Sequence, residues 1–197
     1  MNYPLRGRPV TGTMQELALR CGTSKATGHS YMPVYEAMLP ERQFPVRLLE
    51  IGVYRGESIR MWLEWFAHPD TMVYGVDTCP ESVLHDPRYV YHACDQRDAV
   101  LGTLFPPESL DVIVDDACHD PPAQRRSFEL LWPALKPGGQ YWIEDVNVFH
   151  PSYVVERDGD ILRHWLTMPG CHVWANFMDG HGNYRDDDIL VMVEKQR

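Results

Sequence analysis

The sequence lacks the features that mark membrane, secreted and nucleic-acid-binding proteins. No apolar run approaches the roughly 18 residues that a membrane-spanning helix needs, and residues 1–12 have no apolar centre of a signal peptide. The five cysteines form no CxxC pair, so we expect reduced thiols in a cytoplasmic protein, without a disulfide framework or a zinc knuckle. Basic residues are outnumbered, 18 against 28 acidic ones, which disfavours nucleic acid or an anionic membrane as partner.

The composition otherwise fits one globular domain. The chain has 197 residues, of which 44% are hydrophobic and 23% charged, and this length leaves no room for a second full domain. The net charge of −10 is unevenly spread, because residues 101–197 hold 16 of the 28 acidic side chains but only 8 of the 18 basic ones. This half could hold a cation among carboxylates, or it could present a solvated acidic surface.

From residue 47 onward, short apolar runs alternate with segments of helical spacing. This alternation is typical of a parallel sheet with helices on both faces. Two later apolar runs, 171–178 and 188–194, flank a turn rich in Gly, Asp and Asn and predict a closing antiparallel hairpin. We therefore predict an α/β fold with a doubly wound, mostly parallel, seven-stranded Rossmann-like sheet and a C-terminal hairpin. The expected parallel strands are 47–53, 72–77, 89–95, 110–116 and 140–146, and the expected helices lie around 59–66, 98–105 and 128–135.

Two further helices are expected before the sheet. The capping-box spacing of Thr13 and Glu16 predicts the first, and an apolar stripe over 31–38 predicts the second. The linker CGTSKATGHS between them is small and polar, which predicts a loop. The chain is thus divided into an N-terminal helical cap segment, 1–40, and the domain proper, 41–197.

Acidic residues stand at or near the carboxyl end of all five expected parallel strands. Ligands bind beyond this edge of such sheets, and a carboxylate there costs desolvation free energy unless it meets a cation or a hydrogen-bond donor. Five acidic strand ends in register therefore predict a polar ligand-binding crevice. The residues are Glu50, Asp77, Asp95, Asp115, Asp116, Glu144 and Asp145.

The loop after the first strand, LLEIGVYRGES, contains two glycines but no GxGxxG motif. Gly52 and Gly56 permit a tight turn, and Ser58 lies in the opening turn of the next helix. This spacing disfavours a pyrophosphate and favours a less anionic nucleoside. Asp77, about 25 residues further on, is placed to accept hydrogen bonds from ribose hydroxyls.

The later acidic strand ends predict a cation site. Asp115 and Asp116 are adjacent, so their side chains are expected on opposite faces of the strand and only one is an easy ligand. Carboxylates without a Cys or His cluster suit Mg²⁺, Mn²⁺ or Ca²⁺. His119 would lie above the ion and accept the proton of a hydroxyl that the ion makes more acidic. The alternative is that His119 caps the following helix beside a hydrated acidic cluster.

Five motifs lie within residues 22–146: GTSKATGHSYMPVYE, LLEIGVYRGESIRMW, CDQRD, VIVDDACHD and LKPGGQYWIED. In these motifs the chain resembles the class I S-adenosylmethionine-dependent methyltransferases. More narrowly, it is similar to the metal-dependent macrolide and rhamnosyl sugar O-methyltransferases and their cephalosporin-hydroxylase-like relatives. It departs from them at Ala117 and Cys118, where the subfamily usually has Gly and Ser, and in its shorter length.

The resemblance implies roles for individual residues. His119 would be the general base of methyl transfer. The amino-acid end of the cofactor would meet Glu50, Gly52 and Ser58, its ribose Asp77, and its adenine Asp95 and Gln96. A divalent ion, Mg²⁺ or Mn²⁺, would be held by Asp116, Glu144 and Asp145. Further expected contacts with the cofactor are Lys25, Tyr31, Tyr54 and Asp115, and His150 is a candidate for the substrate pocket.

The expected function is metal-assisted methyl transfer from S-adenosylmethionine to a hydroxyl of a sugar or a glycosylated small molecule. Relatives of this kind assemble, so a homo-oligomer is an open expectation. Three alternatives remain. A nicotinamide oxidoreductase is disfavoured by the missing GxGxxG and Tyr-x-x-x-Lys motifs, and a hydroxylase would need a second histidine beside His119. The third is a protein that binds S-adenosylmethionine without transferring its methyl group.

Overall fold

The computed structural model describes residues 12–78, 84–146, 171–177 and 189–197. Seven strands form one sheet in the order β3-β2-β1-β4-β5-β7-β6. The first five are parallel, and β7 is antiparallel to both β5 and β6. The predicted doubly wound sheet with its C-terminal hairpin is therefore confirmed. The strands are β1 (Arg47–Ile51), β2 (Met72–Asp77), β3 (Tyr89–Ala93), β4 (Leu110–Asp115), β5 (Leu135–Ile143), β6 (Cys171–Phe177) and β7 (Ile189–Lys195).

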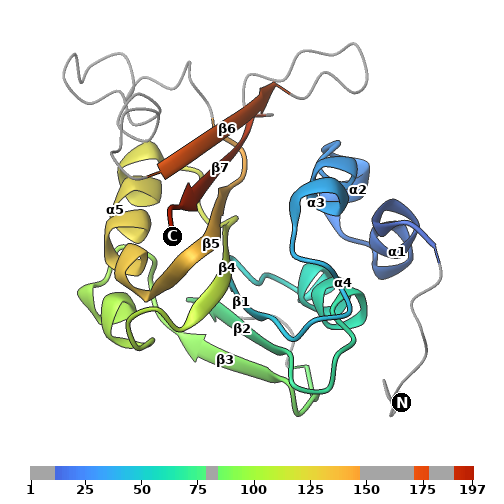
Figure 1. Cartoon of the computed structure of the whole chain (residues 1–197), viewed down its shortest axis with the longest axis horizontal. Helices are drawn as coiled ribbons and strands as arrows, with labels where there is room; N and C mark the ends of the chain where they lie inside the picture. Colours follow the sequence, from blue (N-terminus) through green and yellow to red (C-terminus); the bar gives the residue numbers. More distant parts are fainter. Residues whose placement is uncertain (1–11, 79–83, 147–170, 178–188) are drawn as a thin grey trace.

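Helices cover the two faces of the sheet (Figure 1). The helices α1 to α4 lie on one side, where their apolar residues pack with Leu48, Val112 and Trp142 of the sheet. On the other side, α5 and a 3₁₀ helix pack on Ile113 and Tyr141. The helices are α1 (Met14–Cys21), α2 (Ser24–Thr27), α3 (Met32–Met38), α4 (Glu57–Trp65) and α5 (Pro121–Leu131), with 3₁₀ helices η1 (Ala99–Thr103) and η2 (Trp132–Ala134).

The N-terminal segment follows its sequence signals except in the linker. Thr13 and Glu16 form the predicted capping box at the start of α1. The linker expected to be a loop contains α2, a single helical turn that begins after the N-cap Thr23. The loop prediction for this linker was wrong, because four residues are too few to show any hydrophobic periodicity.

The strand β5 begins earlier than predicted. Leu135 already pairs with Leu110, whereas the sequence suggested a strand from residue 140. Pro137 and the two glycines after it have the composition that usually follows the end of a helix, but here they lie within β5, where the pairing with β4 shifts register. Gly138 has φ of +79°, which glycine adopts without strain at such an irregularity.

The strand order reverses beside β1, which pairs with β2 on one side and β4 on the other. Ile51 is in register with Asp115, and Asp115 with Ile143. The next amides continue the ladder, since Asp116 donates to Ile51 over 2.9 Å and Glu144 donates to Asp115 over 3.0 Å. The acidic strand ends therefore lie side by side at the point where such sheets bind their ligands.

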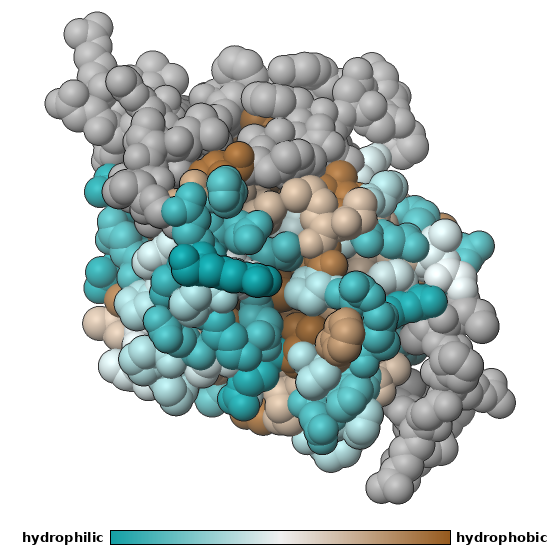
Figure 2. Space-filling view, viewed as in Figure 1, coloured by the Kyte–Doolittle hydropathy of each residue, from teal (hydrophilic) through white to brown (hydrophobic). Residues whose placement is uncertain are grey.

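Hydrophilic residues predominate on the face shown in Figure 2, with hydrophobic residues visible between them in small areas. Within the described ranges, no helix is both long and apolar enough to cross a membrane. The turn predicted between β6 and β7 and the candidate pocket residue His150 lie outside the described residues.

Candidate active site

A cavity of about 700 Å³ opens at the carboxyl ends of β1, β2 and β4. This volume lies within the range of small-molecule binding sites. Its wall also includes Gly22, Thr23 and Ser24 from the N-terminal segment, which begin one of the quoted motifs but were given no role there. Eight predicted site residues line the cavity: Gly52, Tyr54, Ser58, Asp77, Asp95, Gln96, Asp116 and His119.

The loop after β1 is held by the loop after β4 and by Asp77. Gly52 has φ of +92°, and a Cβ atom at this position would overlap the backbone carbonyl oxygen of Asp116. Asp77 Oδ2 accepts hydrogen bonds from the amides of Val53 (2.8 Å) and Tyr54 (2.9 Å). Gly52 is thus required for the close approach of two protein loops, and Asp77 holds the first of them. The contact of Asp77 with a ribose stays a prediction.

The wall next to β3 is polar. Asp95 pairs with Arg97 through Nε at 3.0 Å and a terminal nitrogen at 2.7 Å, and this hydrogen bonding lowers the pKa of Asp95 to about 2. Gln96 is buried, and its Oε1 accepts a hydrogen bond from the amide of Cys118 over 3.0 Å. Gln96 thereby ties this wall to the loop that carries His119.

Asp115 and Asp116 point to opposite sides of the sheet, as predicted. Asp115 is fully buried on the α5 side, where the Ser127 hydroxyl donates to its Oδ2. Burial raises the pKa of Asp115 to about 7. Gln96 Nε2 lies 3.4 Å from its Oδ1. Asp115 does not line the cavity, so it is placed to orient Gln96 and not to touch a ligand directly.

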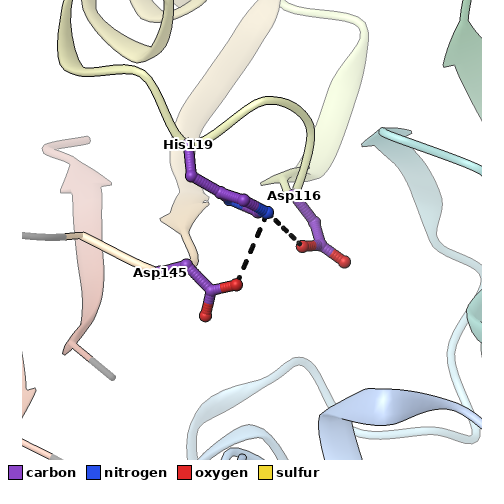
Figure 3. A group of neighbouring side chains, drawn as sticks. All are labelled: Asp116, His119 and Asp145. Carbon is purple, nitrogen blue, oxygen red and sulfur yellow. Dashed lines mark ion pairs between the residues drawn. The ribbon is translucent and has the colours of Figure 1, made fainter. Parts of the chain in front are cut away.

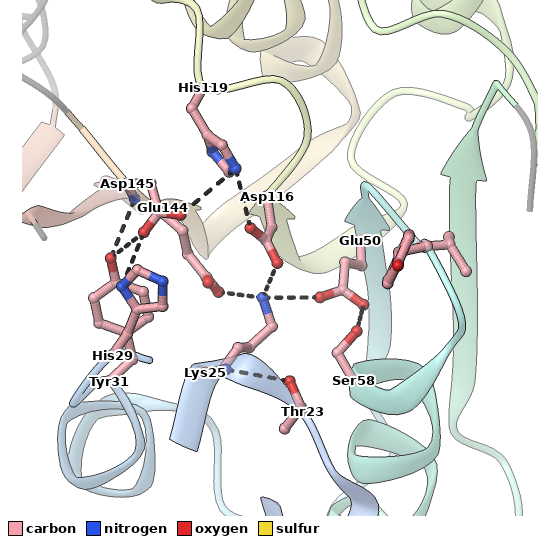
Figure 4. Close-up of polar contacts among 12 residues, drawn as sticks. Thr23, Lys25, His29, Tyr31, Glu50, Ser58, Asp116, His119, Glu144 and Asp145 are labelled. Carbon is pink, nitrogen blue, oxygen red and sulfur yellow. Dashed lines mark hydrogen bonds and ion pairs between the residues drawn. The ribbon is translucent and has the colours of Figure 1, made fainter. Parts of the chain in front are cut away.

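Lys25 lies at the centre of the acidic cluster, between the ends of three strands (Figure 4). Its Nζ is 2.7 Å from Glu144 Oε1 and 3.2 Å from Glu50 Oε1, and it also contacts Asp116 Oδ2. Burial alone would lower the pKa of Lys25, but these carboxylates outweigh it and raise that pKa well above its ordinary value. Lys25 is 1% exposed. It was predicted to meet the cofactor, but the structure places it behind the cavity wall, paired with carboxylates.

The remaining oxygens of this cluster meet hydroxyl groups. Ser58 donates to Glu50 Oε2 over 2.7 Å, and Tyr35 donates to Glu144 Oε1 over 2.6 Å. Burial raises the pKa of both Glu50 and Glu144 despite the nearby ammonium group. Tyr35 was assigned to an apolar stripe in the sequence, and no local signal marked its contact with a residue 109 positions away.

His119 points its Nε2 between Asp116 and Asp145 (Figure 3). The distances are 3.9 Å to Asp116 Oδ1 and 3.5 Å to Asp145 Oδ2. On the far side of Asp145, the Tyr31 hydroxyl donates to Oδ1 over 2.5 Å, and His29 Nδ1 lies 3.4 Å from the same atom. Tyr31, predicted to meet the cofactor, therefore contacts a predicted metal ligand.

The side chains of Asp116, His119 and Asp145 could hold one metal ion, since one donor atom from each lies within 4.8 Å of the others. The two carboxylate oxygens of this group suit a hard cation such as Mg²⁺ or Mn²⁺. Glu144, the third predicted ligand, is outside this group: its Oε1 accepts from Lys25 and Tyr35. The group holds a single histidine, so the two-histidine arrangement of an iron hydroxylase is not formed among the described residues.

Backbone strain concentrates at this site. Four non-glycine residues in the described chain have positive φ, and three of them are Tyr54 (+46°), His119 (+54°) and Asp145 (+54°). They follow β1, β4 and β5, three adjacent strands of the sheet. Left-handed backbone at such residues costs of order 1–3 kcal/mol each and tends to cluster at functional sites.

A family model described as a methyltransferase domain matches residues 49–146. This range includes every carboxylate of the cluster and His119, but not Lys25 and the tyrosines of the N-terminal segment. The chain belongs to the class I methyltransferases. The resemblance seen in the sequence motifs is thereby confirmed.

Two curated relatives are O-methyltransferases. The 8-demethyl-8-alpha-L-rhamnosyl tetracenomycin-C 2'-O-methyltransferase of Streptomyces olivaceus is 34% identical over 78% of this chain and 43% of its own length. The mycinamicin VI 2''-O-methyltransferase of Micromonospora griseorubida is 34% identical over 74% of this chain and 39% of its own. The chain thus spans less than half the length of these relatives.

A solved structure extends the likeness over most of the chain. The MycE methyltransferase of the mycinamycin biosynthetic pathway, solved with Mg, SAH and mycinamycin VI, covers 94% of this chain with a TM-score of 0.74 and 27% identity. This chain covers 55% of that structure. The shared α/β methyltransferase fold therefore extends over nearly the whole chain.

Proposed function

We propose that the protein transfers the methyl group of S-adenosylmethionine to a hydroxyl of a sugar or a glycosylated small molecule, assisted by Mg²⁺ or Mn²⁺. The observation that carries this proposal is the position of a polar cavity directly beside the group formed by Asp116, His119 and Asp145. The relatives whose names specify sugar-bearing acceptors support the substrate class.

The cavity fits a sulfonium nucleoside. Its wall offers the carboxylates of Asp77 and Asp95 and the amide of Gln96, which suit ribose and adenine. Ser58 lines the same cavity and is hydrogen-bonded to the buried Glu50, so this pair would lie at the amino-acid end of the cofactor. Carboxylates on the wall favour a ligand with positive charge over a pyrophosphate. The structure solved with SAH supports this cofactor class.

The acidic group fits a hard divalent cation. Asp116 Oδ1 and Asp145 Oδ2 both face His119, and each carboxylate has its second oxygen engaged by another residue. Glu144 remains a proposed ligand, and a bond to the ion would use its Oε2 or exchange its contacts with Lys25 and Tyr35. When bound, the cation supplies positive charge that makes an acceptor hydroxyl more acidic.

His119 is proposed as the general base. Its Nε2 faces the two carboxylates at the edge of the cavity and would accept the acceptor hydroxyl's proton. The oxygen then forms a bond to the methyl carbon as the carbon–sulfur bond breaks, which yields the methyl ether and S-adenosylhomocysteine. The protein contributes mainly alignment of oxygen, carbon and sulfur.

The test is a methyl-transfer assay with isotopically labelled cofactor and a panel of rhamnosides and other glycosides, run with Mg²⁺ and with EDTA. We expect labelled product with Mg²⁺, its loss in EDTA, and its recovery when Mg²⁺ is returned. S-adenosylhomocysteine should also raise the melting temperature by mass action. Cofactor binding without transfer to any glycoside would favour a binding role, and absence of binding at millimolar cofactor would reject the proposal.

A further inference from the structure

Lys25 is a buried cation that the proposed chemistry does not use. Its ammonium group contacts carboxylates that follow or belong to three strands: Glu50 on β1, Asp116 after β4 and Glu144 after β5. Lys25 is fully buried, and so are Glu50 and Glu144. A buried charge costs several kcal/mol unless it is well paired, so these groups stabilise one another only as a set.

Asp116 divides the acidic cluster into two halves. Its Oδ2 contacts Lys25 on the inner side, together with Glu50 and Glu144. Its Oδ1 faces His119 on the outer side, together with Asp145 (Figure 4). The outer half borders the cavity, because Asp116 and His119 line it, whereas the inner half is closed.

The inner half has the donor set of a second cation site. Glu50 Oε1 is fully buried, and its ion-pair partner is the Lys25 ammonium group, 3.2 Å away. Three carboxylates around one point would attract a hard cation if that point were empty. Lys25 fills it with a single positive charge supplied by the chain.

We propose that Lys25 is a positioning residue that occupies the inner half of the acidic cluster and restricts the site to one divalent cation in the outer half. Its ammonium group fixes Asp116 so that Oδ1, and not Oδ2, is presented to the ion. The proposal rests on the metal site of the proposed function.

The structure also explains why this cation comes from the N-terminal segment. Lys25 lies on α2, directly after Gly22, Thr23 and Ser24 of the cavity wall. Thr23 accepts a hydrogen bond from the Lys25 amide and caps the helix. The same contacts that fill the inner half therefore hold the wall of the cavity in place.

The test is a calorimetric Mn²⁺ titration, with the Mn²⁺ electron paramagnetic resonance spectrum recorded at each stoichiometry, on wild type, Lys25→Arg and Lys25→Met. We expect one ion in the wild type and in Lys25→Arg, which retains the charge. Lys25→Met should bind a second ion, with the spectral broadening of two neighbouring Mn²⁺ ions. The double variant Lys25→Met, Glu50→Gln removes one inner carboxylate and should weaken that second ion at least tenfold.

Folding provides an independent readout. If Lys25→Met is unfolded in metal-free buffer, Mn²⁺ at millimolar concentration should refold it, measured by circular dichroism, because the ion replaces the missing charge. Failure to refold, or one ion bound with wild-type affinity by Lys25→Met, would overturn the proposal. A wild type that binds S-adenosylhomocysteine but no Mn²⁺ would instead contradict the metal part of the proposed function.

Discussion

Two regions of the site, the rim of the cavity and the acidic cluster, are stabilised in different ways. At the cavity rim, Asp95 pairs with Arg97 two residues away, and both side chains are solvent-exposed. In the acidic cluster, Lys25 reaches Asp116 across 91 residues and Glu144 across 119. Lys25 and Glu144 are buried, and Asp116 is partly buried. Exposed ion pairs contribute little to stability, whereas breaking a buried one costs about 3–5 kcal/mol. The rim can therefore vary at small cost, but the cluster must be complete for the chain to fold around it.

His119 lines the cavity and also belongs to the outer half of the acidic cluster. Its replacement should have the largest effect on activity. His119→Ala should reduce the rate of methyl transfer by about 10²–10⁴-fold, because a general base typically contributes that much. S-adenosylhomocysteine affinity, measured by calorimetry, should change less than threefold. His172→Ala, at an exposed position on β6, is the control. An unchanged rate in His119→Ala would remove this residue from the mechanism, and loss of Mn²⁺ binding would make it a ligand.

Gly52→Ala should disturb both the cavity wall and the acidic cluster. A Cβ atom would overlap the carbonyl oxygen of Asp116 at a φ of +92°, so the loops after β1 and β4 must separate. We expect a loss of about 3 kcal/mol or more in the free energy of unfolding, from strain and displaced packing together, measured by urea denaturation. Gly22→Ala is the matched control: φ is +81°, but nothing lies within 4 Å of the added atom, so only about 1 kcal/mol should be lost. Equal losses would show that crowding at Asp116 is unimportant.

Tyr31→Phe should affect the outer half alone. The Tyr31 hydroxyl donates to Asp145 Oδ1, and loss of such a contact behind a metal ligand typically costs about 10–100-fold in metal affinity. Mn²⁺ titration should show this weakening, while S-adenosylhomocysteine affinity stays within about threefold. Tyr35→Phe removes the hydroxyl that donates to Glu144 in the inner half. A weakening in Tyr35→Phe equal to that in Tyr31→Phe would contradict the division of the cluster.

Asp95→Asn should have the smallest effect on folding. Hydrogen bonds from Arg97 lower the pKa of Asp95 to about 2. Its contribution to stability is present above the unfolded pKa, near 4, and is lost only as the pH falls toward 2. Between pH 6 and 8 the melting temperature of Asp95→Asn should therefore lie below that of the wild type by a small amount that does not change with pH, because the pair with Arg97 is exposed, and the affinity for the cofactor product should fall modestly. A clear pH-dependent difference in this range would mean that the rim is coupled to the buried cluster.

Most of the sheet and the polar residues at the cavity rim could be predicted from the sequence. Buried parallel strands are dense apolar runs, and their acidic ends are visible as local patterns around Asp77 and Asp95. The prediction that the side chains of Asp115 and Asp116 lie on opposite faces was also correct, since side chains alternate along a strand.

The interior of the cluster was not predictable in the same way. Nothing near Lys25 in the sequence indicates that its ammonium group lies among Glu50, Asp116 and Glu144. Such contacts depend on how the N-terminal segment packs against the ends of strands, two of which lie 91 and 119 residues away. The early start of β5 was missed for a local reason, because Pro137 and the following glycines have the composition of a turn.

The most direct measurement is an anomalous difference map from crystals grown with Mn²⁺ and S-adenosylhomocysteine. The account predicts one Mn²⁺ peak bonded to Asp116 and Asp145 on the side that faces His119, with the nucleoside in the adjoining cavity and the Lys25 ammonium still between Glu50 and Glu144. A nucleoside bound elsewhere, or a Mn²⁺ peak at a distance from these carboxylates, would contradict it.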